Sequence, residues 1–224
     1  MKITILRLGV CNCFLIKGRQ GYVMVDAGDL KQFGRFKRLI NERDIIPEDI
    51  KLIIITHAHF DHVANLAEIK RLCQCPVLIH PYEASVMAAG QVLIPPGTNA
   101  LGHLVSGIGK RIKPLLAFKA CEGEIMVDKE FDLKPYGVDG TVLSTPGHTP
   151  GSLSVLLDDG RAMVGDLAMN FMGARVYPLF AELPLEVYSS WDLLVKRGAQ
   201  MIFPAHGYPF SVERIKESMK KYTV

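Results

Sequence analysis

Residues 56–62 read Thr56-His57-Ala58-His59-Phe60-Asp61-His62, so three imidazoles and one carboxylate stand within six positions. The apolar run Leu52-Ile53-Ile54-Ile55 comes directly before them and predicts a buried strand. In open α/β sheets, binding sites form outside the carboxyl ends of the strands. We therefore expect a metal site where this strand ends, and one that holds two ions.

Length and composition bound the class of protein. The chain has 224 residues, of which 49% are hydrophobic and 22% are charged. These values are typical of a globular protein, and the length fits one large domain. We expect a single domain that spans residues 1–224.

Charge and hydropathy narrow the partners. The formal net charge of +3 does not favour nucleic acid. No apolar run approaches the roughly 18 residues that a membrane-spanning helix needs, and Arg7 interrupts the apolar N-terminal residues, which favours a strand over a signal segment. The five cysteines lack the spacing of zinc knuckles and are expected to be reduced. We expect a cytoplasmic protein with a small-molecule substrate and neither nucleic acid nor membrane as a partner.

Apolar periodicity predicts alternating strands and helices, as in an α/β protein. Strands are expected at residues 4–16 (one or two strands), 22–25, 51–55, 76–79, 124–127, 141–144, 152–157, 161–164 and 201–203. Helices are expected at residues 33–40, 63–72, 184–195 and 211–222. Glycines and prolines interrupt residues 81–120, which we expect to form short helical pieces, either as a wall of the site or as an irregular connection.

Three further ligand-type residues follow predicted strands in the second half of the chain. They are His148, Asp166 and His206. A single histidine is more often an ordinary polar residue than a ligand, but a repeated order of strand, turn and ligand favours one shared site. His80 and His103 lack this setting, so we leave them outside the site.

Five motifs, in this order, resemble the metallo-β-lactamase superfamily of metal-dependent hydrolases. They are Val25-Asp26-Ala27-Gly28, Thr56 to His62, Pro146 to Ser152, Gly165-Asp166 and Pro204-Ala205-His206-Gly207. The resemblance covers nearly the whole chain. It implies a four-layer αββα sandwich with two similar halves and with metal ions at one edge between two sheets.

The resemblance also implies how the ligands divide between two divalent ions. One ion would be held by His57, His59 and His148, the other by Asp61, His62 and His206, and Asp166 would bridge them. Imidazole and carboxylate ligands suit zinc first, and also iron or manganese. A hydroxide that bridges the metal ions would be the nucleophile, and Asp61 would be the catalytic acid and base. Asp26 would orient a ligand histidine or would only form a turn.

Departures from known branches narrow the substrate. Class B β-lactamases have a cysteine at the position of Asp166, which argues against antibiotic hydrolysis. The ligand set is similar to those of glyoxalase II and of acyl-homoserine lactonases. Glyoxalase II adds a C-terminal helical region, whereas this sequence ends shortly after His206, and the lactonases have a tyrosine at the position of Met169. We expect a hydrolase of a small ester, thioester or lactone.

The loop of residues 170–177 follows Asp166 and is expected to face the cleft. Phe171 and Tyr177 would line a pocket for acyl or ring groups, or would pack beneath the loop. Two alternatives to hydrolysis stay open. The first is an oxidoreductase similar to persulfide dioxygenases, with one iron held by a subset of these ligands. The second is a module that binds metal or a partner without catalysis.

Overall fold

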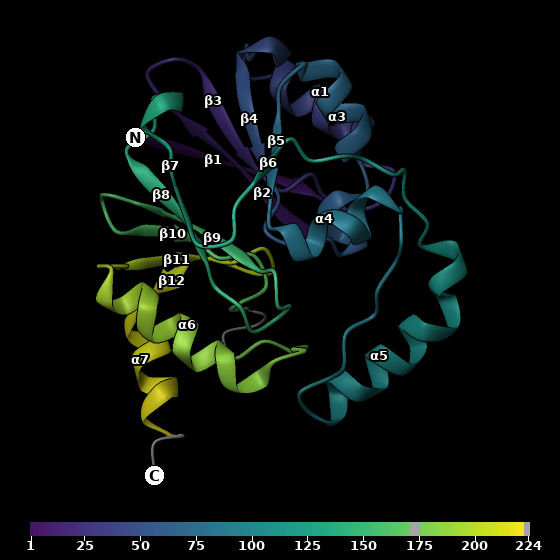
Figure 1. Cartoon of the computed structure of the whole chain (residues 1–224), viewed down its shortest axis with the longest axis vertical. Coiled ribbons are helices and arrows are strands. Elements are labelled where there is room, and N and C mark those ends of the chain that lie inside the picture. The colour runs from purple at the N-terminus through teal and green to yellow at the C-terminus, as the bar shows by residue number, and fades with distance from the viewer. Residues whose placement is uncertain (171–174, 222–224) are drawn as a thin grey trace.

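Two six-stranded sheets lie face to face in the computed structural model, with helices on their outer sides (Figure 1). The structure describes residues 1–170 and 175–221. The first sheet has the spatial order β1 (Lys2–Leu8), β2 (Cys11–Lys17), β3 (Tyr22–Val25), β4 (Ile50–Ile54), β5 (Val77–Ile79) and β6 (Ile125–Met126). The second has the order β12 (Phe210–Ser211), β11 (Met201–Phe203), β10 (Arg161–Met163), β9 (Leu153–Leu157), β8 (Gly140–Ser144) and β7 (Glu130–Asp132).

Each sheet combines an antiparallel hairpin with parallel strands. In the first sheet β1, β2 and β3 pair antiparallel, and β3 to β6 pair parallel. In the second sheet only the β10 and β11 pair is parallel among the described strands. The carboxyl ends of the parallel strands therefore meet at one edge of each sheet, which is where the predicted ligands follow in the sequence.

Alternation along β4 shows why the sheets stack. Leu52 and Ile54 belong to a core between the two sheets, together with Val142 and Val155 from the second sheet. Ile53 belongs to a separate core on the outer face. Successive side chains of a strand point to opposite faces of the sheet. A strand whose residues are nearly all apolar, such as β4, therefore needs a covering layer on both faces.

Helices close the two outer faces. On the first sheet, α1 (Phe33–Asn41) and α3 (Leu66–Cys73) contribute Phe36 and Ile69 to the outer core. On the second sheet, α6 (Pro184–Lys196) and α7 (Glu213–Lys220) contribute Trp191 and Ile215. The predicted four-layer αββα sandwich is confirmed.

Two predicted helices differ from the observed ones. The helix expected at residues 63–72 is divided into α2 (Phe60–Val63) and α3, because the side chain of Asn65 bonds elsewhere: its Nδ2 donates to the carbonyl oxygens of Ala27 and Asp29 at 2.8 and 2.7 Å. The final helix begins at Glu213 rather than at residue 211, since Phe210–Ser211 pairs with β11 as a strand.

Residues 81–120, expected to form short helical pieces, contain α4 (Pro81–Ala88) and the longer α5 (Ala100–Ile112). α5 continues through three glycines, which we expected to break it. A Cβ on Gly102 would lie 2.4 Å from the carbonyl oxygen of Leu179, so the glycine lets the helix approach this backbone. Within the described residues no helix is long and apolar enough to cross a membrane.

Candidate metal centre

Seven side chains meet where strands of both sheets end. β4 leads into the loop with His57 and His59 and into α2, while β8, β10 and β11 are each followed by one further side chain. All except Asp61 are buried. The structure brings together all seven predicted ligands: His57, His59, Asp61, His62, His148, Asp166 and His206.

Six of the seven side chains form two groups of three, which adjoin each other, since ligand atoms of His57, His62 and Asp166 also lie within 4.8 Å of one another. In the first group, one ligand atom each from His57, His59 and His148 lies within 4.8 Å of the others. In the second, the same holds for Asp61, His62 and His206. These are the two sets that the resemblance implied.

Asp166 lies between the two groups, and its two oxygens face different histidines. Its Oδ1 lies 3.2 Å from Nε2 of His206 and 3.4 Å from Nε2 of His62. Its Oδ2 lies 3.6 Å from Nε2 of His148. One carboxylate thus contacts both groups from a position after β10.

The polar atoms at the centre fit a divalent cation. Nε2 of His57, Nε2 of His62 and Oδ1 of Asp166 are buried and have no hydrogen-bond partner within the described part of the chain. In addition, Nδ1 of His59 lies 2.9 Å from Nε2 of His148. Buried nitrogen and oxygen atoms without partners are costly, and imidazole with carboxylate is a donor set for zinc, iron and manganese.

Asp26 supports the second group from behind. Its Oδ2 lies 2.9 Å from Nδ1 of His62, and its Oδ1 accepts the backbone N–H of Thr56 at 2.9 Å. The hydroxyl of Thr56 also contacts both oxygens of Asp26 and lies 3.1 Å from Nδ1 of His57. Asp26 therefore orients an imidazole, and it occupies a left-handed turn as well, with φ of 61°.

Three supporting contacts were not predicted from the sequence. Nδ1 of His148 donates to the carbonyl oxygen of Phe180 at 2.8 Å, and Nδ1 of His206 to that of Val10 at 3.0 Å. Oε2 of the buried Glu83 accepts the N–H of Ala58 at 2.9 Å, between two of the predicted ligands. Every residue has a carbonyl, and Glu83 lies in a segment without a readable pattern, so no sequence signal marks them.

In the metal-free protein, the pKa values of the histidines shift in opposite directions in the two groups. Burial and the neighbouring imidazoles lower the pKa of His57 far below its usual value, and burial, aided by His148, lowers the pKa of His59 to about 3. Burial acts on His206 in the same direction, but Asp166 and Asp61 outweigh it and raise its pKa well above the usual value. The pKa of His62 is likewise raised against the effect of burial, by Cys11, Asp26 and the other carboxylates.

A cavity of about 380 Å³ opens onto these groups. His59, Asp61, His148, Asp166 and His206 form its polar floor. Its walls are largely apolar and include residues of α5. Part of segment 81–120 is therefore a wall of the site, which was one of the two alternatives predicted for this segment. His80 and His103 are not among the described residues that line it.

Of the two aromatic residues expected to line a pocket from loop 170–177, Tyr177 does not line this cavity. The hydroxyl of Tyr177 donates to the carbonyl oxygen of Pro184 at 2.8 Å, and its ring packs against Tyr188 and Trp191. Tyr177 thus packs beneath the loop, and within the described part of the chain it is absent from the cavity wall. Phe171 lies outside the described residues.

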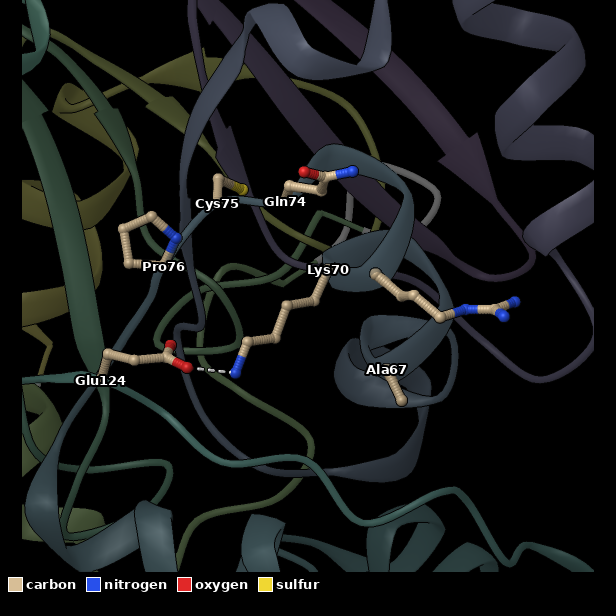
Figure 2. A pocket seen from close by; sticks show the side chains of 7 residues that line it. Ala67, Lys70, Gln74, Cys75, Pro76 and Glu124 are labelled. Atoms are coloured by element: carbon tan, nitrogen blue, oxygen red, sulfur yellow. Dashed lines mark hydrogen bonds and ion pairs between the residues drawn. The ribbon is translucent and has the colours of Figure 1, made fainter.

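A second hollow, of about 500 Å³, lies at the amino-terminal end of β5 (Figure 2). It is lined by α3 residues, by Cys75 and Pro76, and by an ion pair between Lys70 and Glu124. The predicted ligands follow the carboxyl ends of the strands instead, and none of them lines this hollow. The candidate metal centre is therefore the cavity at the opposite edge of the sheet.

The αββα sandwich carries histidines and carboxylates grouped at one sheet edge, an arrangement that fits divalent metal ions. The sequence profile described as "Metallo-beta-lactamase superfamily" matches residues 6–206, and the chain belongs to this superfamily. The chain is 31% identical over 164 residues to the "probable metallo-hydrolase" YflN of Bacillus subtilis, a match that spans 71% of this chain and 61% of that protein.

Two further proteins are similar over more of their length. The "probable metallo-hydrolase" MJ0888 of Methanocaldococcus jannaschii is 28% identical over 200 residues, which span 88% of this chain and 87% of that protein. The crystal structure of TTHA1623 in a di-iron-bound form superposes with a TM-score of 0.70 at 22% identity and covers 95% of this chain and 96% of the other. The structural likeness supports the fold.

Proposed function

We propose that this protein is a dinuclear metal-dependent hydrolase of small esters, thioesters or lactones. The observation that carries the proposal is the position of Asp166, whose two oxygens face two separate groups of histidines. A single ion would leave one of these groups without a partner. Two groups on either side of one carboxylate support two ions with a shared ligand.

Each group has a defined role in the proposal. His57, His59 and His148 would hold one ion, and Asp61, His62 and His206 the other, with Asp166 between them. Two divalent ions in such a site, with zinc as the proposed metal, would supply water activated near neutral pH and would polarise a substrate carbonyl. Asp26, Phe180 and Val10 hold the outer nitrogens of three imidazoles, so the inner nitrogens keep their direction.

Asp61 is the proposed acid and base. It is the most exposed of the predicted ligands and the one that is only partly buried, and it lies on the cavity floor. Burial alone would raise its pKa, but His62 and His206 outweigh this and lower the pKa to about 2. Without metal, Asp61 is therefore ionised at neutral pH. Its assignment as acid and base rests on its position on the cavity floor, within reach of attacking water, and not on this low pKa.

Metal analysis with a substrate screen tests the proposal. We expect close to two transition-metal ions per chain in protein purified without chelator, and hydrolysis of simple esters, thioesters or lactones that a chelator abolishes and zinc, iron or manganese restores. A single bound iron together with oxygen consumption on glutathione persulfide would place the protein among oxidoreductases. Less than one bound ion after reconstitution would contradict both reactions.

A further inference from the structure

We propose that the cavity beneath α5 binds an uncharged aliphatic acyl chain, so that the substrate is an acyl ester, thioester or lactone with its carbonyl at the histidine groups. The inference rests on the proposed hydrolase and assigns the part of the substrate that does not react. It follows from the lining of the cavity, its charge and its connection to His148.

Two segments supply apolar side chains to the cavity walls. α5 supplies Val105, Ile108 and Ile112, and the segment before it supplies Leu93 and Ile94. Its volume of about 380 Å³ is within the range of small-molecule sites. Apart from Ser106 of α5, whose hydroxyl donates to the carbonyl oxygen of Pro95 at 2.8 Å, the polar side chains lie on the floor with the candidate ligands, so a bound molecule meets mainly apolar side chains away from its reacting end.

Apolar side chains of α5 are incompletely covered by protein. Val105 is 41% exposed, Ile108 50% and Ile112 42%, although all three line the cavity. Covering such surface with an alkyl chain removes apolar area from water on both partners. Each buried methylene group is worth about fourfold in binding.

The charge of the lining excludes an anionic tail. No lysine or arginine occurs among the described residues that line the cavity, while Asp61 and Asp166 form part of its floor. Lys110 and Arg111 belong to the same helix but are exposed and are absent from the lining. Away from the floor, where the proposed metal ions would be held, a carboxylate or phosphate would be desolvated without a cation to pair with it, which is costly.

One segment connects the apolar wall to the candidate metal centre. Phe180 lines the cavity, and its carbonyl oxygen accepts a hydrogen bond from Nδ1 of His148 at 2.8 Å. The same segment holds the base of α5: Phe180 forms a β-bridge with Gly97, and the N–H of Thr98 donates to the carbonyl oxygen of Leu179 at 2.9 Å. The position of the wall is therefore tied to that of a predicted ligand.

A chain-length series of p-nitrophenyl esters, from acetate to decanoate, tests the assignment on the metal-loaded protein. We expect kcat/KM to rise about fourfold for each added methylene until the cavity is filled, and then to level off. Val105→Phe, which narrows the cavity, should move this plateau to shorter chains. A flat profile in the wild-type protein would overturn the inference while leaving the hydrolase proposal intact.

Two substitutions in α5 form a matched pair. Ile108→Ser changes the cavity wall and should lower the ratio of decanoate to acetate hydrolysis by tenfold or more. Leu104→Ser changes an apolar residue of the same helix that is 62% exposed and does not line the cavity, so it should leave the ratio unchanged. Equal effects of the two substitutions would contradict the inference.

Binding to the metal-free protein separates this inference from the proposed reaction. In calorimetry, 1-octanol should bind at least tenfold more tightly than 1-butanol, and Ile108→Ser should remove the difference. If octanol binds in this way while no ester is hydrolysed, the apolar site stands and the hydrolase proposal fails. If octanol and butanol bind equally weakly, the apolar site is wrong.

Discussion

Oδ2 of Asp26 lies 2.9 Å from Nδ1 of His62, and both side chains are completely buried. This contact occupies the outer nitrogen of the imidazole and leaves Nε2 directed at Asp166, 3.4 Å away. Asp26 is itself held by the backbone N–H and the hydroxyl of Thr56. The orientation of a candidate ligand is therefore set by residues of two neighbouring strand ends.

Asp26→Asn tests this orientation. An amide can present a donor where the carboxylate accepts, so the tautomer that exposes Nε2 of His62 is no longer enforced. We expect the second ion to bind about 10- to 100-fold more weakly, as measured by competition with a chelator. Asp29→Asn, in the same turn, is the control, since the side chain of Asp29 accepts the N–H of Leu30. Equal affinities in both variants would remove Asp26 from this role.

Asp61→Asn tests proton transfer. The amide keeps the size of the side chain but cannot hold the proton that we assign to it. We expect kcat to fall by about 10²- to 10⁴-fold, measured on the best substrate of the screen. In this variant the group of His57, His59 and His148 should still bind about one metal ion per chain. Undiminished kcat with both ions bound would leave Asp61 as a ligand only.

The two groups should differ in how metal binding responds to pH. His62 and His206 have raised pKa values without metal, so they gain protons first as the pH falls, and a protonated imidazole does not bind metal. His57 and His59 have lowered pKa values and remain neutral in mildly acidic solution. The affinity of the second group for metal should fall by about tenfold per unit decrease in pH for each proton that the metal ion must displace.

Zinc titrations at several pH values measure this difference. Two ions per chain should bind in mildly alkaline solution and one in mildly acidic solution. Calorimetry in buffers of different ionisation enthalpy should detect proton release for the second ion. Equal loss of both ions on acidification would contradict the assignment of the charges.

Gly165→Ala tests the turn before Asp166. Gly165 has a φ of 52°, and a Cβ would lie 2.6 Å from Oγ1 of Thr56, so the substitution combines backbone strain with a steric overlap. We expect the free energy of unfolding to fall by about 2 kcal/mol or more, measured by denaturant titration. Gly198→Ala is the control, because its φ of 90° is also left-handed but no atom lies within 4 Å of the added Cβ. A similar loss in both would attribute the effect to φ alone.

Much of the fold follows from local patterns. Long apolar runs such as those of β4 and β9 are recognisable because they are buried on both faces. The division of the helix at Asn65 was missed, since the amide bonds backbone that is distant in the sequence. The continuity of α5 was missed for the same reason: Gly102 lies against Leu179, which the sequence does not place beside it.

The candidate ligands were predicted together because ligand-type side chains repeatedly followed a strand and a turn. The wall of the cavity was predicted only in part. Segment 81–120 was one candidate for it, and residues of α5 do line the cavity; for Tyr177 two alternatives were open, and it packs on Trp191 instead of lining the cavity. Apolar character alone does not distinguish a side chain that lines a cavity from one that packs in a core.

The sequence by itself determined which residues are candidates for metal binding, because three imidazoles and a carboxylate directly after an apolar strand are a chemical pattern that needs no coordinates. The resemblance implied how they divide into two sets, and only the tertiary structure gave the physical basis of that division. The two oxygens of Asp166 face His62 and His206 on one side and His148 on the other, since strands from two sheets end at one edge. Likewise, only packing of α5 against residues 178–181 places apolar side chains over that edge.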